Sequence, residues 1–243
     1  MKLFVKPRKA ATVALIRNTV NETGIEVLLM KRHTNDRFLP GYHVFPGGGV
    51  DERDTPQNNV PDEYLNGMKF HSDEDRVNYF THLICAIRET FEEAGILLAD
   101  TGNSYFSMND PETHERFDSY RRMIFKGELD MIELINRENL VPSYRNIHYL
   151  TRWITPPYSP IRYDTRFFVA LAPDAQNTCH DGDELITAEW LTPAKALLMY
   201  KKGEMKLVTP TVSTLEFLSG FETPVKVIDH LVAEKVSSPA RSF

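Results

Sequence analysis

An acidic segment at residues 88–96, R-E-T-F-E-E-A-G-I, constrains the fold of this chain more than any other feature. Its carboxylates, Glu89, Glu92 and Glu93, are spaced i, i+3 and i+4, which places them on one side of an α-helix. Apolar side chains fill the opposite arc, so we expect one helix face on a core and the other strongly anionic. Like charges four residues apart destabilise a helix by about 0.2–0.5 kcal/mol per pair. The pattern therefore favours a cation beside these glutamates.

Two sources of that cation are open. A solvated helix face on which Arg88 pairs with Glu92 is a common arrangement. Alternatively, a hard divalent cation such as Mg²⁺ prefers oxygen ligands of this kind. The upstream run F-P-G-G-G-V-D at residues 45–51 favours the second source. A glycine-rich turn of this type lets the backbone come close to a ligand or metal.

Together the two segments resemble the Nudix box, G-x5-E-x7-R-E-U-x-E-E-x-G-U, where U is aliphatic. Gly48 corresponds to the leading glycine, and residues 88–96 correspond to the closing half. Asp54 replaces the first glutamate, a spacer of 33 residues (55–87) replaces the short one, and Thr90 replaces the aliphatic residue. An insertion of this length still allows the two halves to meet, because the entropy of loop closure grows slowly with length.

A second motif overlaps the first. It resembles the signature of Nudix hydrolases that cleave coenzyme A, L-L-T-x-R-S-x3-R-x3-G-x3-F-P-G-G-x2-D. Arg32, Arg37, Gly41 and the F-P-G-G run stand at the required spacing, while Met30 and His33 replace Thr and Ser. The long insert inside the box also resembles a peroxisomal-type coenzyme A diphosphatase subgroup and its bacterial relatives.

The resemblance implies a Nudix fold of the α/β (α+β) class, a mixed β-sheet sandwiched between helices, here with helical insertions. We expect one domain over residues 1–243 with its core at about 10–200. Insertions are expected at about 55–77 and 103–147, and a helical tail at about 201–243. Apolar, β-branched runs predict a hairpin from strands at residues 10–17 and 26–31, and further strands at 148–154, 165–172 and 186–191. Helices are predicted at residues 78–94, within 111–139, from Thr192 onward and, as the last one, at 211–218.

The resemblance also implies a metal-dependent site that uses Mg²⁺ or Mn²⁺. Glu92 and Glu93 would be the main metal ligands, Glu89 would share a metal or act as base, and the Gly47 carbonyl would add an oxygen. Arg88 would orient Glu89 through a charge-assisted hydrogen bond.

A further carboxylate is expected from a downstream loop that precedes a strand with a tryptophan. Glu184 lies six residues before Trp190, where the family's loop glutamate often lies. Glu189 is the alternative, so the catalytic base stays open between Glu89, Glu184 and Glu189. A solvated acidic turn is the competing interpretation of residues 181–184.

Contacts to the substrate are predicted for the arginines of the coenzyme A signature, Arg32 and Arg37, and for Gly48. Arg162, Asp164 and Arg166 alternate along an extended run, so the two arginines would project to one face. They would hold phosphate there, with Arg166 as the candidate substrate residue. A cross-strand ladder of ion pairs is an equally good interpretation.

The expected reaction is hydrolysis of the diphosphate of coenzyme A or acyl-CoA to 3′,5′-ADP and 4′-(acyl)phosphopantetheine. Another nucleoside diphosphate-linked substrate, such as NADH or an ADP-sugar, is the alternative within the enzyme class. A nucleotide-binding Nudix module without catalysis is the alternative outside it. Because all the glutamates of the helix are present, the enzyme is favoured.

Composition limits the partners. The net charge of −6 argues against nucleic acid, since that binding is largely electrostatic. No run reaches about 18 consecutive apolar residues, so no transmembrane helix is expected.

Cys85 and Cys179 are the only cysteines, which suggests free thiols in a reducing compartment. The terminal Arg-Ser-Phe is not the S-K-L peroxisomal address, so the cytoplasm is the expected location. A homodimer is left open.

Overall fold

The computed structural model describes residues 5–20, 24–36, 38–56, 60, 70–102, 104–174, 176, 178 and 185–237. The strands are β1 (Arg8–Asn18), β2 (Ile25–Arg32), β3 (His43–Val44), β4 (Gly47–Gly49), β5 (Ala99–Thr101), β6 (Ser104–Tyr105), β7 (Val141–Pro142), β8 (Ile147–Ile154), β9 (Tyr163–Leu171) and β10 (Leu185–Leu191). The helices are the 3₁₀ turn η1 (Glu52–Asp54) and α1 (Asp73–Ala94), α2 (Pro111–Phe125), α3 (Met131–Arg137), α4 (Pro193–Lys201), α5 (Thr209–Leu218) and α6 (Pro224–Ser237).

The centre of the molecule is a seven-stranded mixed sheet with the path β10-β2-β1-β9-β8. The central strand β1 runs parallel to β9 and antiparallel to β2, which confirms the predicted hairpin. The glycine strand β4 also pairs antiparallel with β1, from Ala10 opposite Gly49 to Thr12 opposite Gly47. The first half of β1 therefore carries the glycine turn in a fixed register.

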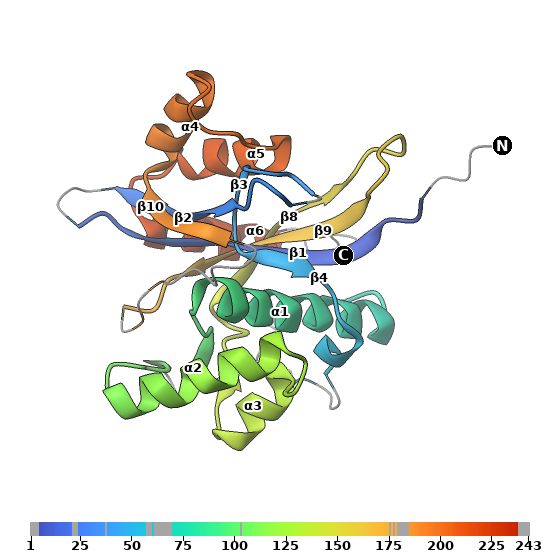
Figure 1. Cartoon of the computed structure of the whole chain (residues 1–243), viewed down its shortest axis with the longest axis vertical. Coiled ribbons are helices and arrows are strands. Elements are labelled where there is room, and N and C mark those ends of the chain that lie inside the picture. Colours follow the sequence, from blue (N-terminus) through green and yellow to red (C-terminus); the bar gives the residue numbers. More distant parts are fainter. Residues whose placement is uncertain are drawn as a thin grey trace.

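Two hydrophobic cores lie on opposite faces of this sheet, because successive side chains of a strand point to opposite faces. Ala11, Val13 and Leu15 of β1 enter a core shared with α1, α2 and α3. Ala14 and Ile16 enter a second core with side chains of α4, α5 and α6. Figure 1 shows the two helical layers above and below the sheet. The arrangement is the predicted mixed sheet between helices.

Helix α1 begins five residues earlier than the predicted start at residue 78. Ser72 is the N-cap of the helix, and its side chain accepts a hydrogen bond of 3.1 Å from the N–H of Asp75. The acidic first turn, Asp73 to Asp75, suits the positive end of a helix dipole. That turn has no apolar periodicity, so the hydrophobic pattern alone does not reveal it.

The helical region predicted within residues 111–139 is confirmed as α2 and α3, which end and begin on either side of Gly127. A small sheet, β6-β5-β7, flanks these helices. Figure 1 shows α2 and α3 below α1, on the side away from the central sheet. The prediction of a last helix at residues 211–218 was wrong in one respect, because α6 follows α5 and covers part of the sheet. Within the described ranges, no helix is long and apolar enough to span a membrane.

Candidate active site

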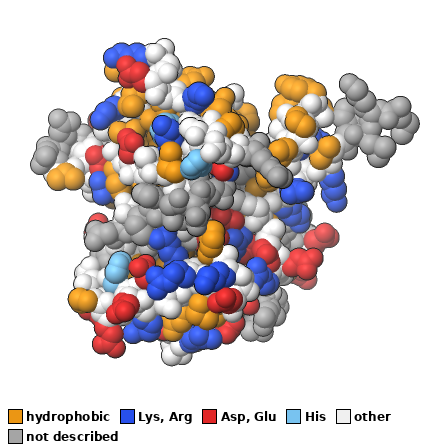
Figure 2. All heavy atoms as spheres, in the orientation of Figure 1, with side chains coloured by type: hydrophobic (Ala, Val, Ile, Leu, Met, Phe, Trp, Pro, Cys, Tyr) orange, Lys and Arg blue, Asp and Glu red, His pale blue; other side chains and the backbone are white. Residues whose placement is uncertain are grey.

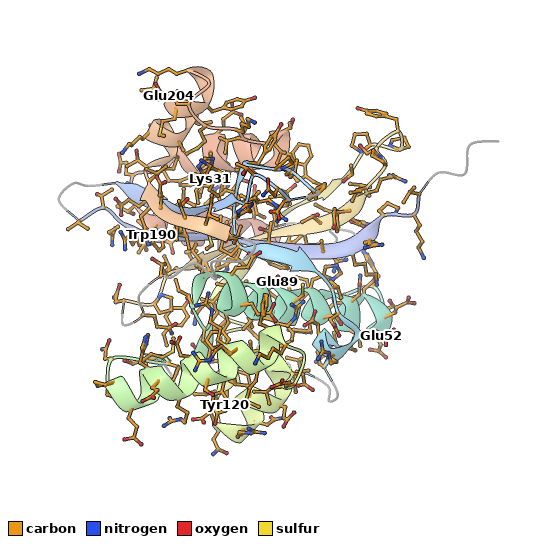
Figure 3. The ribbon with its side chains drawn as sticks, in the orientation of Figure 1. Lys31, Glu52, Glu89, Tyr120, Trp190 and Glu204 are labelled. Atoms are coloured by element: carbon orange, nitrogen blue, oxygen red, sulfur yellow. The ribbon has the colours of Figure 1, made fainter. Side chains whose placement is uncertain are left out.

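The acidic end of α1 lies directly under the glycine strand β4 (Figures 1 and 3). Gly95 ends the helix in the left-handed conformation, with φ of 70°, and its N–H donates to the Phe91 carbonyl. Thr90, which replaces the aliphatic residue of the box, is buried, and its hydroxyl donates to the Ala86 carbonyl over 2.7 Å. The polar residue at this box position is therefore accommodated in the core.

Glycines are required in the turn because its backbone touches two other elements. A Cβ at Gly47 would lie 2.4 Å from the Ala11 carbonyl oxygen of β1. A Cβ at Gly48 would lie 2.5 Å from Oε1 of Glu89. Real Cβ atoms do not approach other atoms this closely, so the absence of a side chain lets the turn fit between β1 and α1.

The three glutamates make different contacts at this turn. The Gly47 N–H donates a hydrogen bond of 2.7 Å to Oε2 of Glu93. The Glu89 carboxylate lies against Gly48, as the position of the missing Cβ shows. Glu89 and Glu92 both accept hydrogen bonds from Nη1 of Arg88, over 2.9 and 3.2 Å. The structure thus brings together Gly47, Gly48 and all three glutamates.

The predicted acidic face is more enclosed than a solvated helix face. Glu93 is only 4% exposed. The side chains of Glu89 and Glu92 are 12% and 15% exposed, so the pairing with Arg88 is not an ordinary surface ion pair. This enclosure follows from the glycine turn, which the helical periodicity of the segment cannot reveal.

Arg88 is the centre of the hydrogen-bond network. Its Nε and Nη2 donate to the two oxygens of Asp54 over 2.8 and 3.0 Å, a bidentate pair. Nη2 also donates to the Gly49 carbonyl over 2.9 Å. Asp54 is 1% exposed and also accepts a hydrogen bond from the N–H of Asp51. The aspartate at the position of the box's first glutamate therefore holds Arg88, which in turn holds Glu89 and Glu92.

The charges of this network do not cancel. Asp54, Glu89 and Glu92 share the single guanidinium of Arg88. Burial raises the pKa of Glu89 to about 7, and the neighbouring Glu92 raises it as well, against the lowering effect of Arg88. Burial also raises the pKa of Glu92. An additional cation beside these carboxylates would relieve this electrostatic cost.

The donor set fits a hard divalent cation, since every candidate ligand offers oxygen: the carboxylates of Glu89, Glu92 and Glu93 and the Gly47 carbonyl. The surplus of buried negative charge supports the same conclusion. Across the described ranges, no three acidic, histidine or cysteine side chains already converge on one point. The glutamates instead contact Arg88 and the Gly47 N–H.

Other predicted site residues lie elsewhere or outside the described ranges. Arg37 and Glu184 fall outside them. Arg32 donates from Nε to the Phe38 carbonyl over 2.9 Å and forms an ion pair with Asp36, so it braces the segment after β2. In the pairing of β10 with β2, Glu189 lies opposite Leu29, and the side chain of Leu29 enters the core formed with α4, α5 and α6. Glu189 therefore projects to the sheet face opposite α1.

Arg166 is 2% exposed and lies between the sheet and the first half of α1. Its Nη1 lies 2.9 Å from Nδ1 of His82 and donates to the Asn78 carbonyl over 3.1 Å. Asp164 forms its ion pair with Arg152 on the neighbouring strand β8, over 2.6 Å. The contacts match the ion-pair ladder for Asp164 and place Arg166 in the interior, apart from the glutamate cluster.

Cys85 lies on α1 beside the site, and it is a free, fully buried thiol. Its Sγ is 3.5 Å from the Gly49 carbonyl oxygen. Burial raises the pKa of this thiol well above its usual value, and the charge of Glu89 adds to the effect. A protonated, buried thiol is a weak nucleophile, so Cys85 has the properties of a packing residue.

Sequence reasoning did not identify Asp54 as the partner of Arg88, nor Arg121 of α2 as a neighbour of the site. Arg121 donates to the backbone carbonyls of Glu92 and Glu93. Asp54 could have been found from its place in the box, where a carboxylate is expected. Arg121 lies in an insertion and has no motif of its own.

A glycine turn set against an R-E-x-x-E-E helix, on a mixed sheet between two helical layers, defines a Nudix hydrolase. The family model described as the NUDT19 Nudix domain matches residues 69–218, and the chain belongs to this family. The match confirms the predicted branch of the superfamily, in which the coenzyme A diphosphatases lie.

Curated relatives support the same placement. The chain is 25% identical over 247 residues to the acyl-coenzyme A diphosphatase NUDT19 of Xenopus laevis, covering 88% of this chain and 65% of that protein. It is 25% identical over 230 residues to the human protein of the same name, covering 82% and 61%. The chain thus spans less than two thirds of the length of these relatives.

Among solved structures, a Nudix hydrolase from Alicyclobacillus acidocaldarius is 27% identical, with a TM-score of 0.71. The match covers 93% of this chain and 97% of that one. It confirms the predicted Nudix fold of the α+β class over nearly the whole chain.

Proposed function

We propose that this chain hydrolyses the diphosphate bond of coenzyme A or an acyl-CoA, with Mg²⁺ or Mn²⁺, to 3′,5′-ADP and 4′-(acyl)phosphopantetheine. The observation that carries the proposal is the contact between the glycine turn and α1, where Gly47 binds Glu93 and Gly48 lies against Glu89. This contact assembles the acidic cluster of a Nudix box in spite of its long spacer. The coenzyme A signature at residues 28–51 and the names of the relatives support the substrate.

Each residue of the cluster has a proposed role. Glu89, Glu92, Glu93 and the Gly47 carbonyl would hold the metal. The bound metal would neutralise the charge of the diphosphate and make the attacking water more acidic. Arg88 keeps Glu89 and Glu92 in place through its hydrogen bonds. Glu89 is also a candidate for the base that takes the proton of water, and Glu184, outside the described residues, is the other candidate.

Substrate contacts are proposed for Arg32, Arg37 and Gly48. The bond of Arg32 to the Phe38 carbonyl supports a role for Arg32 in bracing the chain that follows β2. The buried position of Arg166 argues against direct contact with the substrate. Figure 2 shows Lys and Arg side chains interspersed with Asp and Glu side chains on the lower half of the face.

A substrate panel tests this proposal. Purified protein would be incubated with coenzyme A, an acyl-CoA, dephospho-CoA and NADH, each with Mg²⁺ or Mn²⁺, and the products identified by mass spectrometry. We expect 3′,5′-ADP from coenzyme A, a lower rate with dephospho-CoA and no reaction with EDTA. Equal or faster cleavage of NADH would replace the proposed substrate. Absence of cleavage with every compound would support a binding module.

A further inference from the structure

The C-terminal end of α1 is an unfavourable place for acidic side chains. A helix dipole is negative at its C-terminus, so cations are stabilising there and anions are not. Glu89, Glu92 and Glu93 all lie in the last two turns, and the last turn of α1 contains no basic residue. The last carbonyls of a helix also lack partners within the helix. The Phe91 carbonyl accepts a hydrogen bond from the N–H of Gly95. The carbonyls of the residues after Phe91 must therefore find their partners in other elements.

Arg121 of the helical insertion binds two of these carbonyls. Its Nε donates to the Glu92 carbonyl over 2.8 Å, and its Nη2 donates to the Glu93 carbonyl over 3.0 Å. The guanidinium thus supplies the cation that the last turn of α1 lacks, from a residue 28 positions after Glu93. Its two donors bind the peptide units whose side chains are the proposed metal ligands. A planar guanidinium that binds two adjacent carbonyls restricts their orientation more than one hydrogen bond would.

The insertion also touches the other half of the box. Arg53 lies in η1, beside the Asp54 that holds Arg88, and its Nη1 donates to the Gly127 carbonyl over 3.2 Å. Gly127 lies between α2 and α3. The same insertion therefore contacts both the first half of the box and the end of its acidic helix.

We infer that Arg121 is a positioning residue of the metal site. It holds the last turn of α1 in place, and with it the carboxylates of Glu92 and Glu93. Its effect on metal binding rests on the proposed function. The bond from Arg121 to the helix end is a separate claim about the fold, so the two can be tested separately.

The test compares wild type with Arg121→Ala, Arg121→Lys and the control Arg122→Ala. Arg122 is the next residue on the same helix and is exposed. Mn²⁺ binding would be measured without substrate by electron paramagnetic resonance. Hydrogen exchange would report on the amides in the last turn of α1. We expect Arg121→Ala to weaken Mn²⁺ binding by about 10-fold or more and to speed exchange in that turn, because residues that orient metal ligands have effects of this size.

Arg121→Lys keeps the charge but not the two-pronged geometry, so it should recover part of the affinity. Arg122→Ala should match wild type in both measurements. Unchanged Mn²⁺ affinity in a folded Arg121→Ala protein would overturn the inference. If wild type itself binds no Mn²⁺, the metal site of the proposed function fails instead. In that case hydrogen exchange still decides the role of Arg121, and unchanged exchange in the last turn would overturn it.

Discussion

The side chain of Glu93 accepts a hydrogen bond of 2.7 Å from the N–H of Gly47, a residue 46 positions earlier in the chain. The neighbouring Gly48 lies so close to Glu89 that no side chain fits between them. These two contacts join the halves of a motif that 33 residues separate in the sequence. The close approach of backbone to carboxylate requires glycine, and it makes the site sensitive to the smallest substitutions.

Replacing Gly48 by alanine should disable the site. The new Cβ would lie 2.5 Å from Glu89 Oε1, so the carboxylate or the turn must move. A displacement of about 1 Å can reduce turnover by roughly 100-fold, and we expect a loss of that order in the hydrolysis of coenzyme A. The matched control is Gly49→Ala, where a Cβ meets nothing within 4 Å. Similar rates for the two variants would contradict the proposed packing.

Removing Asp54 should destabilise the protein. Asp54→Ala deletes the buried, bidentate partner of Arg88, and breaking a buried ion pair from one side costs about 3–5 kcal/mol. Because Arg88 keeps its hydrogen bonds to Glu89 and Glu92, the loss in the free energy of unfolding should lie near the lower end of this range. Urea unfolding would measure it. Glu52→Ala, an exposed acidic residue of the same turn, should unfold like wild type, and equal values for both variants would refute the role of Asp54.

Acid should destabilise the fold through His82. Burial lowers the pKa of this histidine from 6.5 to about 4, and the nearby Arg166 lowers it as well. Between these two values the unfolded chain binds a proton at His82 that the folded chain does not, so the contribution of His82 to stability falls as the pH drops from 6.5 towards 4. The raised pKa of Glu89 acts in the opposite direction, so the contribution of His82 is measured as the difference between wild type and a His82 variant. The full effect is about 3 kcal/mol.

Unfolding measured across this range should therefore show a smaller loss for His82→Gln than for wild type. His114→Gln, at an exposed position of α2, should follow wild type. If His82→Gln lost as much stability as wild type over the same range, the assignment of this pH dependence to His82 would be wrong.

Divalent metal should stabilise the folded protein. A ligand at about 100 times its dissociation constant adds about 2.7 kcal/mol to the free energy of unfolding, provided that it binds only the folded state. We expect Mn²⁺ to raise the Tm of wild type and EDTA to reverse the shift. A protein with Glu89, Glu92 and Glu93 all changed to glutamine should show no shift. An equal shift in that protein would place the metal elsewhere.

Most of the fold could be predicted from periodic patterns. The strands at residues 10–17 and 26–31 and the helices within 111–139 follow from apolar spacing and turn residues, and the structure confirms them with small changes at the ends. The start of α1 could not be predicted in this way, since Ser72 and the acidic turn after it mark the start by capping and charge. Helix α6 was missed as a separate element within the expected helical tail.

The candidate site was predictable where a motif covers it. The grouping of Glu89, Glu92 and Glu93 follows from helical spacing, and their approach to Gly47 and Gly48 follows from the resemblance to the Nudix box. Their burial does not follow, because it depends on how the turn packs across β1. The direction in which the Arg166 side chain points could not be predicted from the sequence. Its position on an extended strand was predicted, but its side chain points into the interior between the sheet and α1, where it contacts Asn78 and His82.

We propose that the glutamates beside the glycine turn hold the divalent metal with which the protein hydrolyses the diphosphate of coenzyme A. The most direct measurement is the rate of 3′,5′-ADP formation by wild type, Glu93→Gln and Glu74→Gln, with saturating Mg²⁺. Glutamine can still accept the hydrogen bond from Gly47, so Glu93→Gln removes the charge and keeps the packing. Glu74 is exposed in the first turn of the same helix and serves as the control. We expect Glu93→Gln to remain folded and lose turnover, while Glu74→Gln matches wild type. A near-normal rate for Glu93→Gln would contradict the claim.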